Sequence, residues 1–133
     1  MDKDLESIQQ ARDILSKAKR AQEELGNFTQ KQVDDICTAI ADAAFKQAAY
    51  LGQLAVDETG IGRADSKKIK NEFCTRNLMD AMKDLKTAGI ISRDEQRMVF
   101  EIAEPMGTVA AIIPTTNPTS TAICKILISI KSR

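Results

Sequence analysis

The sequence predicts an α/β fold in which a helical segment is followed by the first βα unit of a Rossmann-like domain. Residues 1–95 place apolar side chains three and four positions apart, which is the period of an amphipathic helix. Residues 96–133 begin with strand-favouring side chains, continue with an unbroken apolar run and return to helical spacing. We therefore expect a helical segment over 1–95 and an incomplete cofactor-binding unit of strand, turn, strand, loop and helix over 96–133.

Three helices are predicted in the first part. The first has its apolar positions between Leu5 and Ala21. The second is expected to begin at a capping box, in which Thr29 caps the helix and Gln32 reaches back to it, and to run to about Glu58. Two closely spaced glycines then interrupt the pattern, and a third helix is predicted over about 65–87.

The second part is expected to contain two strands and a helix. Residues 97–102 indicate a half-exposed strand and 104–107 a turn. Residues 108–113 are almost continuously apolar, as in a strand that is buried on both faces. A loop is predicted over 114–120, with a helix from Thr121 onward. Because a buried strand needs neighbours to satisfy its backbone, we expect the domain to be truncated.

Composition excludes several classes of function. Nineteen basic and nineteen acidic side chains give a net charge of zero, which argues against a nucleic-acid partner. The chain has no histidine and its three cysteines are far apart, so the sequence predicts no metal site. Neither a secretory signal nor a membrane-spanning run is visible, which favours a cytoplasmic protein without membrane contact.

The loop over 114–120 carries the most chemistry. It follows the predicted buried strand, and open α/β sheets bind ligands at the carboxyl ends of their strands. Its hydroxyl groups and the amide of Asn117 can donate hydrogen bonds to a developing oxyanion. A purely structural role, in which Thr and Ser cap the next helix and the prolines stiffen the turn, is the simpler explanation on physical grounds alone.

Residues 104–123, with the sequence EPMGTVAAIIPTTNPTSTAI, resemble the CoA-acylating aldehyde dehydrogenases. The similarity is greatest to the aldehyde dehydrogenase half of bifunctional aldehyde-alcohol dehydrogenases. Residues 28–34, 58–62, 69–71 and 83–89 resemble the same family in the same order, so the resemblance covers nearly the whole chain.

The resemblance implies an enzyme that converts an aldehyde to its acyl-CoA with NAD and CoA, through attack by a cysteine thiolate. It implies an oxyanion role for Thr116 or Asn117 and places Pro114 and Thr115 near the cofactor. It also implies that the nucleophilic cysteine and the cofactor's glycine turn belong to the remainder of the domain, and that the protein is a homo-oligomer. The isolated chain is then expected to be inactive and to bind NAD and CoA poorly.

Other interpretations remain open at this stage. The three cysteines are expected to be structural, because buried free cysteine behaves as a small apolar residue. The cluster of Lys67, Lys68 and Lys70 is expected to be a solvated helix face, with contact to a CoA phosphate as the alternative. The helices alternatively form an interaction or assembly module, or the chain is a nonfunctional remnant.

Overall fold

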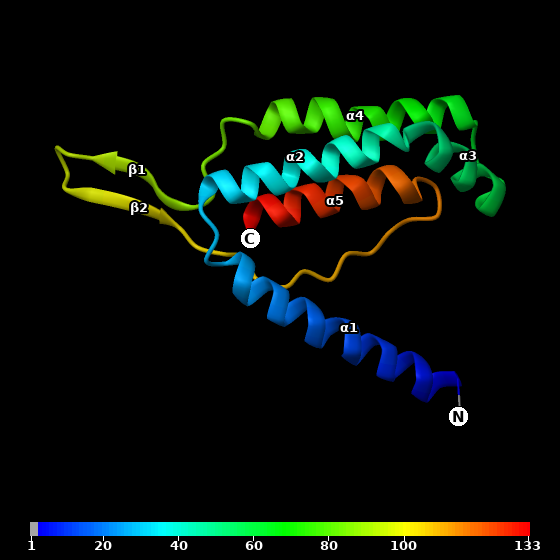
Figure 1. The fold of residues 1–133 in the computed structure, drawn as a ribbon, viewed down its shortest axis with the longest axis horizontal. Coiled ribbons are helices and arrows are strands. Elements are labelled where there is room, and N and C mark those ends of the chain that lie inside the picture. The colour runs from blue at the N-terminus through cyan, green and yellow to red at the C-terminus, as the bar shows by residue number, and fades with distance from the viewer. Residues whose placement is uncertain (1–2) are drawn as a thin grey trace.

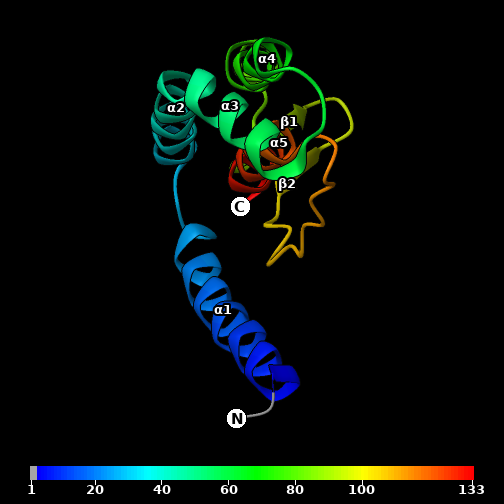
Figure 2. The same ribbon diagram turned by 90° about the vertical axis from the view of Figure 1, so that its right-hand side faces the viewer.

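The computed structural model describes residues 3–133 and contains five helices and one hairpin (Figure 1). Helices α2, α4 and α5 lie side by side, α3 lies across one end, and the hairpin projects from the other end (Figures 1 and 2). Helix α1 points away from this group and buries none of its residues. The elements, in chain order, are α1 (Lys3–Leu25), α2 (Gln30–Lys46), α3 (Ala48–Thr59), α4 (Ala64–Met82), β1 (Gly89–Asp94), β2 (Val99–Ala103) and α5 (Pro118–Ser132).

A small apolar core joins helices α2, α4 and α5, which lie side by side. Full burial of a side chain such as Leu127 contributes about 1.5–3 kcal/mol, so this cluster is the main source of cohesion. Partly buried side chains, Phe28 and Leu78 among them, pack around its edge. Its buried members are Val33, Cys37 and Ala41 from α2, Cys74 and Met82 from α4, and Ile123 and Leu127 from α5.

The predicted second helix begins as expected but is two helices. The capping box is confirmed, because the Thr29 hydroxyl accepts from the Gln32 backbone at 3.3 Å and the Gln32 side chain accepts from the Thr29 backbone at 2.9 Å. A single helix to Glu58 is wrong, since the chain turns at Gln47. The turn lets α3 pack on α4 through Gly52, where an added Cβ would lie 2.9 Å from the backbone of α4. Apolar spacing continues across the turn, so periodicity alone does not reveal it.

The third predicted helix ends earlier than expected, at Met82 rather than near Thr87. The side chain of Gln30 accepts hydrogen bonds from the backbone nitrogens of Thr87 at 2.6 Å and Ala88 at 3.0 Å. These two N–H groups are therefore satisfied by α2 instead of by a further helical turn.

The hairpin confirms one strand and adds another. Strand β2 (Val99–Ala103) lies close to the predicted 97–102, whereas β1 (Gly89–Asp94) falls within the segment expected to be helical. The two strands pair antiparallel from Gly89 opposite Ala103 to Asp94 opposite Val99, with an irregularity between Ile90 and Ser92. Nearly all residues of both strands are exposed.

The buried strand predicted over 108–113 is absent, and this expectation is wrong for the described chain. The segment is irregular, and Val109 and Ile112 are 53% and 86% exposed. Within residues 3–133 the only sheet is the β1–β2 hairpin, so this segment has no strand to pair with. Lys125 Nζ donates a hydrogen bond to the Ile112 carbonyl at 2.6 Å, and this contact holds the segment beside α5.

Arg133 ties three segments of the chain together. Its guanidinium donates to the carbonyls of Gly26 at 2.7 Å, Ala103 at 2.9 Å and Thr87 at 3.0 Å. The residue is buried and has a positive φ of 65°. It therefore joins the end of α1, the base of the hairpin and the segment after α4.

Over residues 3–133, no helix combines the length and apolar character that a membrane crossing requires.

Candidate functional site: the loop before α5

The predicted loop leads directly into α5, which begins at Pro118 and not at Thr121. Proline suits the first helical position because its missing N–H would have no helical partner there. Asn117 is the N-cap residue, with φ −142° and ψ 62°, yet its side chain makes no capping hydrogen bond. The amide of Asn117 is therefore available for another role.

Two lysines of α4 fix the loop in place. Lys67 Nζ donates to the backbone oxygen of Thr116 at 2.8 Å, and Lys70 Nζ donates to Oδ1 of Asn117 at 2.8 Å. Lys67 is only 5% exposed, which is unusual for a lysine. The expectation of a solvated helix face is thus wrong for Lys67, which is buried against the loop, whereas Lys70 is exposed and also binds the loop. Lys68 is also solvent-exposed and pairs with Glu72 at 3.6 Å.

Asn71 completes the attachment of the loop. Its side chain is fully buried, donates to the Ala48 carbonyl at 3.0 Å and accepts from the Thr119 hydroxyl at 2.9 Å. Helices α3, α4 and α5 therefore meet at one satisfied amide, which positions the start of α5 relative to α4. A buried amide with both sides paired favours one arrangement over alternatives.

The two lysines were expected on a solvated helix face, although the sequence carries a signal for burial on this helix. Lys67, Asn71, Cys74 and Met82 lie on the buried face of α4 at helical spacing. A lysine and an asparagine at the start of an otherwise apolar stripe indicate buried polar groups that need partners. The partners themselves lie 47 to 49 residues away, so spacing does not identify them.

Of the four predicted site residues, Asn117 and Thr116 are held by α4, and Pro114 and Thr115 are exposed on the approach to them. Asn117 borders a hollow of about 460 Å³ between α4 and the start of α5. The hollow is open to solvent, and its walls combine apolar surface with a few polar groups. Besides Asn117, the lining includes Ile69, Lys70, Phe73, Cys74 and Ser120.

The cysteine in this hollow is not a nucleophile. Burial, followed by a hydrogen bond with Cys124, raises the pKa of Cys74 to about 12. This shift disfavours the thiolate, which is the reactive form of cysteine. Burial is also the main cause of the raised pKa of Cys37. Across residues 3–133, no three His, Cys, Asp or Glu side chains converge in a way that would hold a metal ion.

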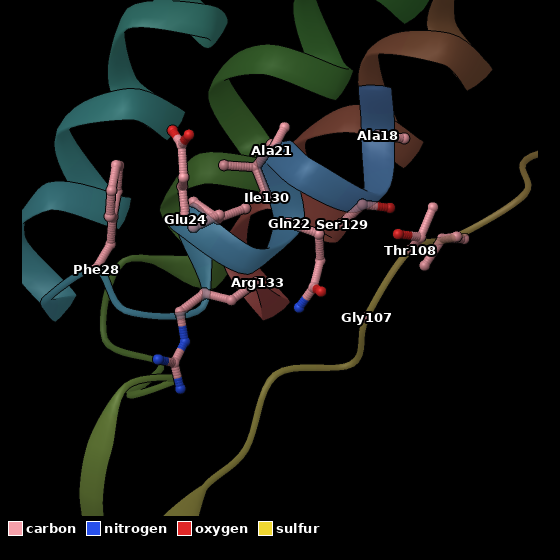
Figure 3. A pocket seen from close by; sticks show the side chains of 12 residues that line it. Ala18, Ala21, Gln22, Glu24, Phe28, Gly107, Thr108, Ser129, Ile130 and Arg133 are labelled. Atoms are coloured by element: carbon pink, nitrogen blue, oxygen red, sulfur yellow. The ribbon is translucent and has the colours of Figure 1, made fainter. Parts of the chain in front are cut away.

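A second hollow, of about 400 Å³, lies between α1, the end of α5 and residues 107–109 (Figure 3). Ala18, Ala21 and Ile130 make much of its wall apolar (Figure 3). Arg133 also borders it, but its guanidinium already donates to three backbone carbonyls. Beside this apolar surface the lining includes the polar side chains of Gln22, Glu24, Thr108 and Ser129 (Figure 3).

Comparison with known proteins agrees with this arrangement. Residues 4–132 match the aldehyde dehydrogenase family. The chain is 47% identical over 120 residues to the bifunctional aldehyde-alcohol dehydrogenase of Escherichia coli, which covers 90% of this chain and 14% of that protein. It is 44% identical over 127 residues to the aldehyde-alcohol dehydrogenase of Clostridium acetobutylicum, covering 96% of this chain and 15% of that protein.

A solved structure gives the same result. The acetylating aldehyde dehydrogenase from Geobacillus thermoglucosidasius superposes with a TM-score of 0.97 at 49% identity, over 98% of this chain and 29% of that one. An irregular 108–113 segment and a projecting α1 are thus compatible with a known fold. The chain belongs to the aldehyde dehydrogenase family. It spans about a seventh of the length of the curated relatives it matches.

Proposed function

We propose that this chain is the N-terminal part of a CoA-acylating aldehyde dehydrogenase, which converts an acetaldehyde-type aldehyde, CoA and NAD to acyl-CoA and NADH. The observation that carries the proposal is the placement of Asn117, an amide fixed by α4 at the edge of a solvent-open hollow. The name of the Geobacillus relative, an acetylating aldehyde dehydrogenase, supports the same reaction class.

In this reaction a thiolate adds to the aldehyde carbonyl, and the carbonyl oxygen acquires negative charge. Asn117 would donate a hydrogen bond to that oxygen and stabilise it more strongly than the neutral carbonyl. Thr116 is the alternative donor, but its backbone carbonyl is held by Lys67 and its side chain is exposed. Cys37 and Cys74 are poorly suited to supply the thiolate, because both are buried with raised pKa values.

NAD and CoA belong to the proposal for the whole enzyme. Residues 3–133 do not by themselves fit a dinucleotide, because the loop offers the hydroxyls of Thr115 and Thr116 but no glycine-rich turn to approach a pyrophosphate. We expect Pro114 and Thr115 to form one edge of the cofactor site. A cytoplasmic location is part of the same proposal, and the three free cysteines support it.

A hybrid enzyme tests this function. In the Geobacillus protein, residues 3–133 would replace the matching 29%, and purified enzyme would receive acetaldehyde, CoA and NAD. We expect NADH formation that depends on CoA. A folded hybrid that makes no NADH, or makes it equally well without CoA, would contradict the proposal. The isolated 133-residue chain is the control, and we expect it to make none.

A homo-oligomer is also proposed, and the hairpin favours it. A two-stranded sheet is marginally stable alone, and Ile90, Phe100 and Ile102 of this one are exposed. Pairing with a second copy would cover both the apolar side chains and the unpaired strand edges. Light scattering on the hybrid enzyme checks this, and a monomer at all concentrations would refute it.

Helix α1 favours a second candidate function, that of an interaction module. Its apolar residues Leu5, Ile8, Ile14 and Leu15 are between 48% and 68% exposed, and none of its residues is buried. An amphipathic helix of this kind can dock into a groove on another protein. Deleting residues 3–25 separates the two functions, because an assembly helix is dispensable for hybrid activity.

A further inference from the structure

We propose that Lys70 and Lys67 are positioning residues that fix the two hydrogen-bond donors of Asn117, its side-chain nitrogen and its backbone N–H. The inference rests on the proposed oxyanion role of Asn117. It adds that helix α4 orients the loop. The proposed reaction does not by itself imply such a role for any helix.

Lys70 fixes the orientation of the Asn117 amide at the edge of the hollow. An ammonium group only donates hydrogen bonds, so the partner 2.8 Å from Lys70 Nζ must be the amide oxygen. The amide nitrogen is thereby directed away from Lys70. Among residues 3–133 this nitrogen donates to no other group, so it remains free for a ligand oxygen.

Lys67 fixes the backbone in the same way. It holds the Thr116 carbonyl at 2.8 Å, and no peptide bond in the described chain is cis. In a planar trans peptide the following N–H points opposite to the carbonyl, so the N–H of Asn117 points away from Lys67. Both donors of Asn117 are therefore set by α4.

The fold makes room for the buried lysine. Gly62 lies beside it, and a Cβ added there would be 3.4 Å from Cε and 3.7 Å from Nζ of Lys67. The positive φ of 81° at Gly62 also suits glycine. The turn between α3 and α4 thus leaves Lys67 free to reach Thr116.

Without Lys70 the Asn117 amide can turn over, and its oxygen then faces the hollow for part of the time. In a serine protease, loss of one oxyanion donor lowers kcat by about 10² to 10³. Partial loss of orientation is expected to have a smaller effect, at most about 10-fold, because the freed amide still presents its nitrogen to the ligand for part of the time. The KM for the aldehyde should change little.

Nuclear magnetic resonance on the 133-residue chain tests the orientation directly. In ¹⁵N-labelled protein, Lys70→Met should move the side-chain NH₂ signals of Asn117, and Lys70→Arg should largely restore them. Lys68→Met is the matched control, since Lys68 is an exposed neighbour paired with Glu72. Asn117 signals in Lys70→Met that match those of wild type would overturn the inference. Lys70 is exposed, so its substitution should leave the fold intact.

A double-mutant cycle in the hybrid enzyme tests the functional step. If Lys70 acts through Asn117, Lys70→Met lowers kcat by up to about 10-fold alone and has no further effect in an Asn117→Ala background. Equal effects in both backgrounds would overturn the inference while leaving the role of Asn117 in place. If Asn117→Ala itself leaves kcat unchanged, the proposed function fails instead, and the two failures are distinguishable.

Discussion

Lys131 places its ammonium nitrogen 2.6 Å from Oδ1 of Asp34, joining the last turn of α5 to the N-terminal half of α2. Lys131 is 4% exposed, so its charge is almost entirely removed from water. The side-chain amide of Gln30 also donates to the same carboxylate oxygen at 3.0 Å. One acidic residue therefore neutralises the buried end of α5.

We expect Asp34→Asn to lower the free energy of unfolding by about 2 kcal/mol, because it strands the buried Lys131 charge. The value is below that for a fully buried pair, since the Asp34 side chain is 39% exposed. Asp35→Asn is the control, because its pair with Lys31 is exposed and should matter by less than about 0.5 kcal/mol. Urea unfolding measures both, and equal losses would show that Lys131 does not depend on Asp34.

Gly52→Ala reverses the usual effect of this substitution in a helix. Alanine normally stabilises a helix interior by about 1 kcal/mol relative to glycine. Here the new Cβ would lie 2.9 Å from the carbonyl of Ala64 and the backbone nitrogen of Lys68. We therefore expect a loss of about 1–3 kcal/mol from overpacking.

Ala49→Ser on the exposed side of α3 controls for a general sensitivity of that helix and should cost about 0.5 kcal/mol or less. Thermal unfolding compares the two variants. A Gly52→Ala protein more stable than wild type would mean that α3 and α4 do not approach as closely as described.

The raised pKa of Cys74 predicts a loss of stability at alkaline pH. Its pKa rises from the ordinary 9.0 to about 12 in the folded protein, so the folded state retains a proton that the unfolded state loses. The contribution of this thiol to the free energy of unfolding is thus fully present below about pH 9. It declines as the pH rises toward 12.

Urea unfolding between pH 7 and pH 10 checks this in wild type and in Cys74→Ala. The variant should be less stable at pH 7 but should lose less on going to pH 10. The buried Cys37 thiol, whose pKa is also raised, leaves both proteins some decline. Parallel curves for the two proteins would contradict a protonated, buried Cys74.

Local features of the fold were predictable where local chemistry decides them. The capping box at Thr29 and Gln32 involves residues three apart, and the buried positions Ile123 and Leu127 follow simple helical spacing. The break at Gln47 was not predictable in this way, because apolar spacing continues across it and the contact of Gly52 with α4 that it permits is not visible in the local sequence.

The strand expected over 108–113 is a feature that local sequence did not predict correctly. Its sequence has the composition of a central strand, but strand formation needs neighbours that residues 3–133 do not contain. The loop and its resemblance to the family predict Asn117 as a candidate site residue. Its anchors were not predictable, because Lys70 and Asn117 meet only through the packing of α4 on α5.

The most direct measurement is kcat for CoA-dependent aldehyde oxidation by the hybrid enzyme carrying Asn117→Ala or Thr116→Ala. We expect Asn117→Ala to lower kcat by about 10² with little change in the KM for the aldehyde, as for the loss of an oxyanion donor. Thr116→Ala should lower kcat by less than about threefold, because Lys67 holds the backbone and not the side chain of Thr116. Unchanged kcat in Asn117→Ala, or a large loss in Thr116→Ala alone, would contradict the assignment of Asn117 as the oxyanion donor.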